Sequence, residues 1–404
     1  MSISTKINSL LESHDYDIRK SNNARFMDQK VTPDNLCIIA DCIVNLLSED
    51  KSKEFTRNDI WELEYFNKNV KGIFNKPDPS NRYASREYDK YISQPLKMLA
   101  YAGVLSIQKQ GHTNYFKVCD WDILEFIASK VTNALSFLYK YIIEVLNDSD
   151  LYAHFERFRK FAEKGQLGSR EFFDLKTCYE KFIIRYTPIN TVVEVRRIFT
   201  KVLNIFSFKH NIKGTIAGRL SEHPIYYSDL MYNRINWRDV NKDKAITRQE
   251  AELHGHIQTF NENEAMYRYL MQKSINLLSR IHPKSEVEDD LANAGNADYA
   301  HHIFPRSQFK QLAYLLENLI KLTPAQHLSR AHPRGNTHIV DKDYQLICLL
   351  SKSKSIESSL RKGFRFYTKE NFTYVINTGL SVDLSSSLSF KRIREELVSI
   401  YERV

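Results

Sequence analysis

The pattern of hydrophobic and polar positions predicts three helices near the N-terminus. Apolar residues recur every three or four positions over 34–48, which is typical of an amphipathic helix packed on a core. A capping sequence at 56–59 starts a second helix. A third helix is predicted over 85–102, with Pro95 marking a kink or a later start and Gly103 ending it.

Two short segments after the third helix are rich in β-branched and aromatic residues. They cover 104–107 and 114–118 and flank a turn at 110–112, so they predict a β-hairpin. Three helices followed by a hairpin resemble a winged helix-turn-helix. The resemblance implies that the third helix enters the major groove of DNA and that the hairpin contacts the backbone or the minor groove.

Polar side chains on the third helix and on the hairpin are the candidates for DNA contact. Arginine and glutamine can read base edges, whereas lysine more often meets phosphates. The alternatives are a solvated polar helix face and a winged-helix domain used for protein contacts. The candidate residues are Arg86, Lys90, Gln94, Lys97, Lys109 and His112.

The middle of the chain divides into two parts of different composition. From 121 to 195, aromatic and aliphatic residues recur at helical spacing and predict a core and connector. From 196 to 258, basic residues are interleaved with aromatics in what we expect to be loops. Such loops either follow a phosphate backbone or tie two domains together. The basic residues are Lys209, Lys213, Arg219, Arg234 and Arg238.

A strand–loop–strand–helix pattern follows a helix predicted over 261–281. The two strands are predicted over 299–303 and 318–322. Thr323 is a good N-cap for a helix that begins at Pro324. Beyond this pattern the sequence predicts helices over 343–361 and 388–402 and a short strand at 372–376.

Two adjacent histidines, His301 and His302, are the most informative feature of the first of these strands. Neighbouring side chains point to opposite faces of a strand, so at least one imidazole needs a polar partner. Asn318 opens the second strand, and His327 follows one turn into the helix. This spacing suggests that one imidazole holds a metal ion while its neighbour acts as a base.

This stretch resembles the HNH signature of the ββα-metal nucleases, over residues 299–332 only. The resemblance implies that His301 and His327 are metal ligands and that His302 is the general base. It further implies that Asn318 holds the base imidazole in one orientation. A divalent ion would bridge the scissile phosphate and the leaving 3′-oxygen, and the products would carry a 5′-phosphate and a 3′-hydroxyl.

The third metal ligand is where the chain departs from this family pattern. Relatives with three histidines place the last one four residues after the second, but that position is Ala331 here. His332 follows it, just before Pro333, and a helix that tightens or unwinds there could still bring His332 to the ion. The alternatives are Asn336 or a water as ligand, with His332 capping helix carbonyls.

The cysteines bear on the cellular compartment and on the non-catalytic interpretations of the histidine cluster. The five cysteines are scattered and form no CxxC pair, which favours reduced thiols in a cytosolic compartment. A structural zinc site usually recruits cysteine, and no cysteine is close to the cluster in sequence. The remaining alternative is a set of structural histidines near a loop. The cysteines are Cys37, Cys42, Cys119, Cys178 and Cys348.

Composition and charge add a polyanionic partner to this picture. The chain has 404 residues, 42% of them hydrophobic, and a formal net charge of +9. That excludes a disordered protein and suits nucleic acid, because lysine and arginine release counterions from phosphates. The start lacks a signal-peptide core and no apolar stretch is long enough to span a bilayer, so we expect a cytoplasmic protein that does not contact membranes.

We therefore expect an α+β, mainly helical chain with five parts. These are an arm over 1–22, a winged-helix domain over 23–120, a helical connector over 121–258, an HNH domain over 259–345 and a helical extension over 346–404.

The expected function is that of a metal-dependent endonuclease for double-stranded DNA, resembling a type II restriction enzyme. One divalent ion per site is expected, with Mg²⁺ favoured by abundance and Mn²⁺, Ni²⁺, Co²⁺ or Zn²⁺ possible at histidine ligands. A homodimer and a companion methyltransferase are further expectations. The alternatives are a modification-dependent nuclease and a non-catalytic DNA-binding regulator with a degenerate HNH fold.

Overall fold

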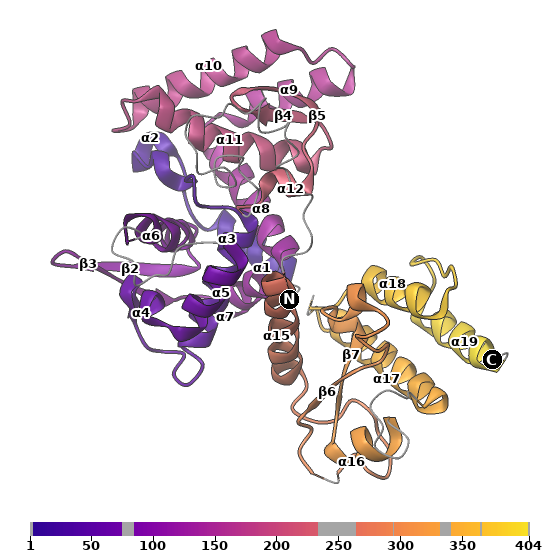
Figure 1. Cartoon of the computed structure of the whole chain (residues 1–404). Helices are drawn as coiled ribbons and strands as arrows, with labels where there is room; N and C mark the ends of the chain where they lie inside the picture. The colour runs from indigo at the N-terminus through magenta and orange to yellow at the C-terminus, as the bar shows by residue number, and fades with distance from the viewer. Residues whose placement is uncertain are drawn as a thin grey trace, which may run out of the picture. The chain divides into compact units, whose positions relative to one another are not determined.

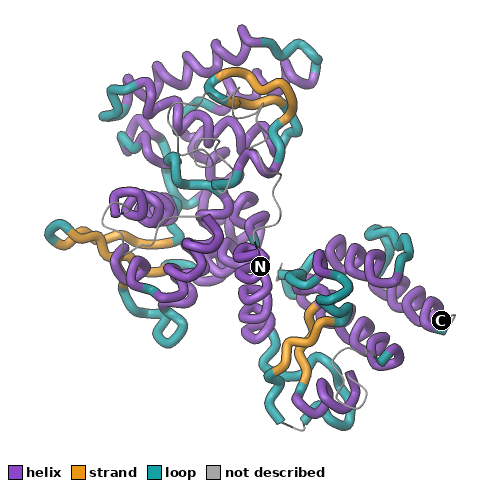
Figure 2. The backbone as a smooth tube through the Cα atoms, in the orientation of Figure 1, coloured by secondary structure: helices purple, strands orange, loops and turns teal. Residues whose placement is uncertain are grey.

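The structure is a computed structural model that describes residues 3–74, 85–232, 264–293, 295–331, 341–363 and 366–402. It is an α+β fold made mainly of helices, as the sequence predicted (Figure 1, Figure 2). Residue contacts divide the chain into two compact units, 4–261 and 262–404, and the second includes residues 1–3. None of the described helices is long and apolar enough to cross a membrane.

The first residues of the N-terminal unit are anchored to its core. Ile7 and Leu11 of α1 (Ile3–Glu12) are buried, as is Ile18 at the start of α2 (Ile18–Ser21). Tyr16 between them is buried as well, and its backbone N–H donates to Asp148 at 2.8 Å. The segment expected to be an arm is therefore packed against the helices that follow it.

The three predicted N-terminal helices are present, with the second divided in two. Thr56 and Asp59 form a capping box at the start of α4, whose last residue is Glu62. Leu63 has an extended backbone and separates α4 from α5. Pro95 lies inside α6. The helices are α3 (Pro33–Leu46), α4 (Arg57–Glu62), α5 (Glu64–Phe74) and α6 (Ser85–Tyr101).

A three-stranded antiparallel sheet in the order β1-β3-β2 accompanies these helices. β2 (Leu105–Gln110) and β3 (Thr113–Val118) form the predicted hairpin, and Gly111 takes a positive φ of 61° in its turn. β1 (Phe55–Thr56), which was not predicted, pairs Phe55 with Phe116. The sheet thus joins the segment ahead of α4 to the hairpin that follows α6.

The rest of the N-terminal unit is helical, with one small hairpin. Four aromatic side chains meet in its core: Phe155, Tyr179, Phe199 and Phe206. The elements are α7 (Trp121–Ser129), α8 (Val131–Asp148), α9 (Tyr152–Glu163), α10 (Ser169–Tyr186), α11 (Val192–Lys209), β4 (Lys213–Ile216), β5 (Arg219–Pro224) and α12 (Tyr227–Leu230).

The loop prediction for 196–258 is wrong at its start and at the β4–β5 hairpin. Residues 196–209 continue α11, because Ile198, Phe199 and Val202 keep a buried stripe at helical spacing. Arg234 and Arg238 lie outside the described residues. The basic and aromatic composition of this segment therefore belongs partly to a packed helix.

The C-terminal unit places a two-stranded sheet among helices. The predicted strand at 372–376 is wrong, because those residues lie in α18, which Thr368 caps. Phe372, Val375 and Ile376 are buried at helical spacing. The elements are α15 (Glu264–Ile281), β6 (Tyr299–His302), β7 (Leu319–Leu322), α16 (Pro324–Gln326), the π-helix η4 (His327–Ala331), α17 (Lys342–Arg361), α18 (Lys369–Leu380) and α19 (Phe390–Tyr401).

A buried polar network attaches β7 to α17. The Glu286 carboxylate accepts from the backbone N–H of Lys321 at 2.8 Å and pairs with Lys352 Nζ at 2.9 Å. The Lys352 ammonium also donates to the Tyr367 hydroxyl at 3.0 Å, and that hydroxyl bonds His282 Nε2 at 2.8 Å. Buried charges are tolerated only when paired in this way, so the network fixes the strand that faces β6.

Candidate active site

The β6–β7 hairpin positions the two adjacent histidines. The strands are antiparallel, with His301 opposite Ile320 and His302 opposite Leu319. Leu319 and Ile320 are fully buried in the core of the C-terminal unit, which fixes the register of the pair. His302 is the last residue of β6, so its side chain stands where the chain leaves the sheet.

Asn318 closes the loop that joins the two strands. Its side-chain oxygen accepts from the backbone N–H of Phe304 at 2.9 Å. Its amide nitrogen donates to the carbonyls of Phe304 and Leu312 at 3.1 and 3.2 Å. The residue is completely buried, and all three contacts go to the main chain. The sequence resemblance gave Asn318 the task of orienting His302, but in the structure it shapes the loop around that histidine instead.

The orienting partner of His302 is the carbonyl of Ala313. The distance from His302 Nε2 to the Ala313 oxygen is 3.0 Å. Because a carbonyl oxygen only accepts hydrogen bonds, Nε2 must carry the proton in this contact. In the neutral imidazole the lone pair is then on Nδ1, which is therefore the nitrogen that can accept a proton.

The surroundings of His302 favour its neutral form. Burial lowers the pKa of this imidazole below its ordinary value, and the positive charge of Arg306 lowers it further. The bond to the Ala313 carbonyl acts in the opposite direction but is the smaller effect. His302 is therefore able to accept a proton at neutral pH.

The short helix after β7 begins where the sequence predicted. The Thr323 hydroxyl accepts from the backbone N–H of Gln326, and the Gln326 side chain accepts from the Thr323 N–H at 2.9 Å. The Gln326 amide nitrogen also donates to the Val287 carbonyl at 2.9 Å and to Asp289 at 2.7 Å. These bonds hold the helix start against the segment that precedes β6, so the position of His327 is well defined.

His301 and His327 come together across the hairpin and this helix. Their ring centroids are 5.3 Å apart, with an interplanar angle of 76°. Two imidazoles that share one ion, with metal–nitrogen bonds of about 2.1 Å and a near-tetrahedral angle, have centroids roughly 5 Å apart. The separation of the two rings is therefore compatible with two ligands of one metal ion, and their angle is also that of edge-to-face ring packing. Tyr299 also stacks on the His327 ring, with ring centroids 4.6 Å apart and an interplanar angle of 19°.

Among the described residues, no third side chain of the His, Cys, Asp or Glu type joins this pair. Within them, no group of three or more His, Cys, Asp or Glu side chains comes together in a way that could hold a metal. His332 lies outside the described part of the chain. The segment from His327 to Ala331 is a π-helix, in which backbone hydrogen bonds join residues i and i+5.

The residues predicted to contact DNA lie in the N-terminal unit and are mostly exposed. Lys90 and Lys97 of α6 and Lys109 and His112 of the β2–β3 hairpin are solvent-exposed. Gln94 is half-buried, and its side-chain oxygen accepts from the backbone N–H of Lys30 at 2.8 Å, which leaves it less free to read a base. The side chain of Arg86 lies outside what the structure describes.

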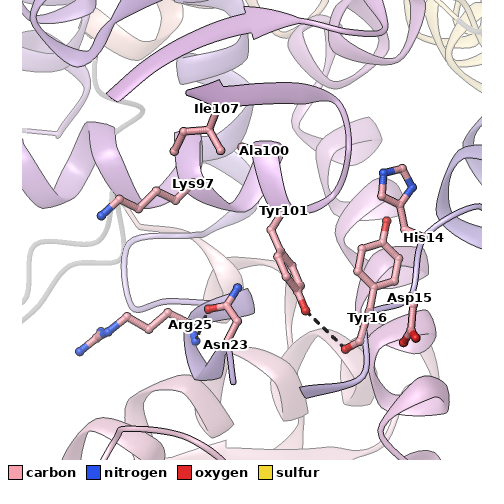
Figure 3. A pocket seen from close by; sticks show the side chains of 9 residues that line it. All are labelled: His14, Asp15, Tyr16, Asn23, Arg25, Lys97, Ala100, Tyr101 and Ile107. Atoms are coloured by element: carbon pink, nitrogen blue, oxygen red, sulfur yellow. Dashed lines mark hydrogen bonds between the residues drawn. The ribbon is translucent and has the colours of Figure 1, made fainter. Parts of the chain in front are cut away.

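A pocket of about 570 Å³ opens beside the C-terminal half of α6 (Figure 3). Tyr101, Lys97 and Ile107 line one wall, and residues of the segment before α3 line the other. Arg25 of this lining is paired with Asp28 and Glu194, so its charge is already neutralised. Lys97 forms no ion pair with the described residues, and its exposed amine belongs to both the pocket and the predicted DNA surface.

Sequence reasoning missed two contributors to this site. Ala313 acts through its main-chain carbonyl, and because every residue has one, the sequence does not indicate which carbonyl takes this role. Tyr299 could have been found, because a strand places residues i and i+2 on one face and so puts it beside His301. Comparisons of this chain with protein-family models, with curated proteins and with solved structures give no match.

Proposed function

We propose that this protein is a metal-dependent DNA endonuclease of the HNH type that uses an N-terminal winged-helix domain to bind double-stranded DNA. The observation that carries the proposal is the bond between His302 Nε2 and the Ala313 carbonyl, which leaves Nδ1 as the basic nitrogen. The bond gives a buried imidazole its polar partner and at the same time sets the tautomer that base catalysis would use. The same elements, a hairpin followed by a capped helix, agree with a ββα-metal module.

In this proposal each residue of the site has a defined task. His302 accepts a proton from water through Nδ1, while the water oxygen attacks phosphorus and the bond from phosphorus to the 3′-oxygen breaks. The 3′-oxygen then takes up a proton from solvent, which gives a 5′-phosphate and a 3′-hydroxyl. Asn318 keeps the loop in the shape that brings the Ala313 carbonyl to His302. His301 and His327 would hold the divalent ion.

The chemistry that a divalent ion supplies when bound is stabilisation of the negative charge that develops on the phosphate and on the leaving oxygen. Neutral imidazole nitrogens suit Mn²⁺, Ni²⁺, Co²⁺ or Zn²⁺, and Mg²⁺ is accepted more readily when water completes its shell.

The DNA-binding part of the proposal rests on the arrangement of the N-terminal unit. The order helix, short strand, helices and hairpin, with a sheet β1-β3-β2, agrees with a winged helix in which α6 is the groove-facing helix and β2–β3 the wing. Exposed lysines stand on both elements, at Lys90, Lys97 and Lys109. A formal charge of +9 for the chain is in keeping with a phosphate-binding surface.

The test is cleavage of plasmid DNA by the purified full-length chain. The protein is incubated with Mg²⁺, Mn²⁺, Ni²⁺, Co²⁺ or Zn²⁺ in separate reactions, on DNA prepared with and without base methylation. Discrete fragments with 5′-phosphate ends are expected, and sequencing of the ends gives the recognition sequence and the stagger. If no ion supports cleavage of either DNA, the nuclease proposal is wrong. Cleavage confined to methylated DNA would instead identify a modification-dependent enzyme.

A further inference from the structure

The main chain that follows His302 is held by helices far from it in the sequence. His302 ends β6, and the next two residues, Ile303 and Phe304, are buried. Asn318 bonds both main-chain groups of Phe304. Further contacts come from α17, α18 and α19, which belong to the same compact unit as the hairpin. The position of the imidazole therefore depends on more than the loop that Asn318 closes.

Gln345 of α17 connects the Ile303 carbonyl to α19. This side chain is buried, and its amide nitrogen donates to the Ile303 oxygen at 2.7 Å. Its amide oxygen accepts from the Tyr401 hydroxyl at 2.9 Å and from the Lys342 ammonium at a longer 3.5 Å. An amide nitrogen only donates and an amide oxygen only accepts, so these partners set which end of the amide faces Ile303. One buried side chain thus ties the main chain directly after His302 to two helices.

Phe304 meets α18 at a glycine. A methyl group on Gly379 would overlap two carbons of the Phe304 ring. Carbon atoms in contact are about 3.5–4.0 Å apart, so the helix can approach this ring only with glycine at that position. The ring is buried and packs against Phe309, with ring centroids 5.6 Å apart. Moving it aside would therefore disturb the loop that follows β6.

The contact that orients His302 is sensitive to small shifts of this main chain. Its Nε2 atom is 3.0 Å from the Ala313 oxygen. Hydrogen bonds weaken steeply with bending and with added distance, so a shift of about 1 Å would break this one. The neutral imidazole would then be free to carry its proton on either nitrogen. A molecule with the proton on Nδ1 has no lone pair there to accept a proton from water.

We propose that Gln345 is a positioning residue for His302. Through the Ile303 carbonyl it holds the main chain where the imidazole reaches Ala313, and Tyr401 keeps its amide in the orientation that this requires. The inference rests on the proposed role of His302 as the base. It adds that α17 and α19 take part in setting the tautomer of that base.

The test reads the tautomer of His302 directly. In protein with ¹⁵N-labelled histidine, NMR correlation of ring nitrogens with ring protons distinguishes a proton on Nε2 from one on Nδ1, and His302→Gln identifies the signal. The wild type is expected to show the Nε2–H form alone. Gln345→Met keeps the approximate length and the helix propensity of the side chain but cannot donate, so both forms are expected. Its single-turnover cleavage rate should fall about tenfold at an unchanged affinity for DNA.

Two further variants separate positioning from loss of stability. Tyr401→Phe removes only the hydroxyl that holds the amide, and a smaller change in the same two quantities is expected. Gly379→Ala should also give both tautomers, because its methyl group displaces Phe304. Tyr374→Phe makes the same change as Tyr401→Phe on an exposed residue of α18 and should leave the tautomer and the rate as in the wild type. Urea denaturation of each variant shows whether it is folded under the conditions used.

The outcomes distinguish this inference from the nuclease proposal. If folded Gln345→Met keeps the Nε2–H form alone, with or without a slower rate, the positioning role is wrong while the nuclease proposal is unaffected. A wild-type chain with both tautomers would contradict the positioning role as well. If Gln345→Met does not fold, Tyr401→Phe and Gly379→Ala decide in the same way. If the tautomer changes as expected but the wild type cuts DNA with no divalent ion, Gln345 positions His302 and the nuclease proposal is wrong.

Discussion

The candidate active site and the candidate DNA-binding surface differ in how firmly the fold holds their side chains. His302, Asn318 and Gln326 of the C-terminal unit each have a defined hydrogen-bond partner, and most of their contacts go to the main chain. Lys97 and Lys109 of the N-terminal unit are exposed and form no ion pairs with the described residues. The first region is organised before any substrate arrives, whereas the second can adjust to one.

This difference follows from the tasks that the two regions are proposed to perform. Proton transfer needs one nitrogen in one orientation, so its supports must be rigid. Phosphate contacts on a duplex are many and individually weak, so no single side chain has to be fixed. We therefore expect single substitutions to have large effects in the active site and small effects on the DNA-binding surface.

The largest effect is expected for His302→Ala. Removal of a general base typically slows the chemical step by about 10²–10⁴-fold, while DNA and metal binding are kept because the histidine serves neither. Single-turnover cleavage and equilibrium DNA binding are measured side by side. His154→Ala, an exposed histidine of the other unit, is the matched control. A His302→Ala protein that still cuts at the wild-type rate would remove this residue from the base role.

Substitution of Asn318 should destabilise the C-terminal unit as well as abolish cleavage. Asn318→Ala removes three hydrogen bonds and takes the side-chain partner from the buried N–H and carbonyl of Phe304, at a cost of about 2–4 kcal/mol in the free energy of unfolding; the Leu312 carbonyl keeps its bond from the Leu315 N–H. Urea denaturation measures this loss. The exposed Asn293→Ala serves as control and should be nearly neutral. A loss below about 1 kcal/mol would contradict the role of Asn318 in closing the loop.

Acid should destabilise the C-terminal unit through His282. Burial lowers the pKa of this imidazole to about 4 from its ordinary value of 6.5. Between these values the unfolded chain binds a proton that the folded chain excludes, so the free energy of unfolding falls as the pH drops from 6.5 toward 4. We expect a contribution of about 2 kcal/mol after allowance for partial exposure.

Urea denaturation of the wild type and of His282→Gln at pH 7 and pH 4.5 measures this contribution. The variant should lose less stability over that interval, because glutamine does not titrate. Equal losses for the two proteins would show that other groups account for the pH dependence.

The smallest effects are expected on the DNA-binding surface. Lys97→Ala and Lys109→Ala should each weaken binding by about 1 kcal/mol at low salt and reduce the slope of log affinity against log salt by about 1. The cleavage rate of the bound complex should not change. Binding isotherms at several salt concentrations provide the measurement, with the exposed Lys362→Ala of the other unit as control. An unchanged salt slope for both variants would argue against DNA contact by α6 and the hairpin.

The sequence predicted the parts of the site that depend on local signals. Thr323 followed by Pro324 is typical of a helix start whatever the surrounding fold, and the structure confirms that a helix begins there. The sequence predicted the bounds of β6, which carries His301, and of β7, which pairs with it, to within one residue at each end. Local signals, namely the capping residues and the residue pattern of the strands, were therefore enough to predict the hairpin and the helix.

The parts that were missed depend on groups far apart in the chain or on main-chain atoms. Asn318 holds the loop in which the Ala313 carbonyl contacts His302. Because every residue has a main-chain carbonyl, the amino-acid sequence gives no signal for this contact. The sequence predicts a strand around Phe372 because five residues rich in apolar types are too few to distinguish the period of a strand from that of a helix. In the structure the buried residues follow the helical period, and the segment lies in α18. Tertiary packing supplied the information that the short patterns lacked.

The closure of the β6–β7 loop by Asn318 has a consequence for how the protein matures. Bringing the ends of this loop together costs roughly 2 kcal/mol of chain entropy, which is recovered only when the main chain on both sides is in place to accept and donate. The Ala313 carbonyl reaches His302 only in that closed state. On the proposed function, a partly folded or newly synthesised chain carries both histidines without a correctly oriented base, and DNA cleavage is expected to arise together with the completed fold.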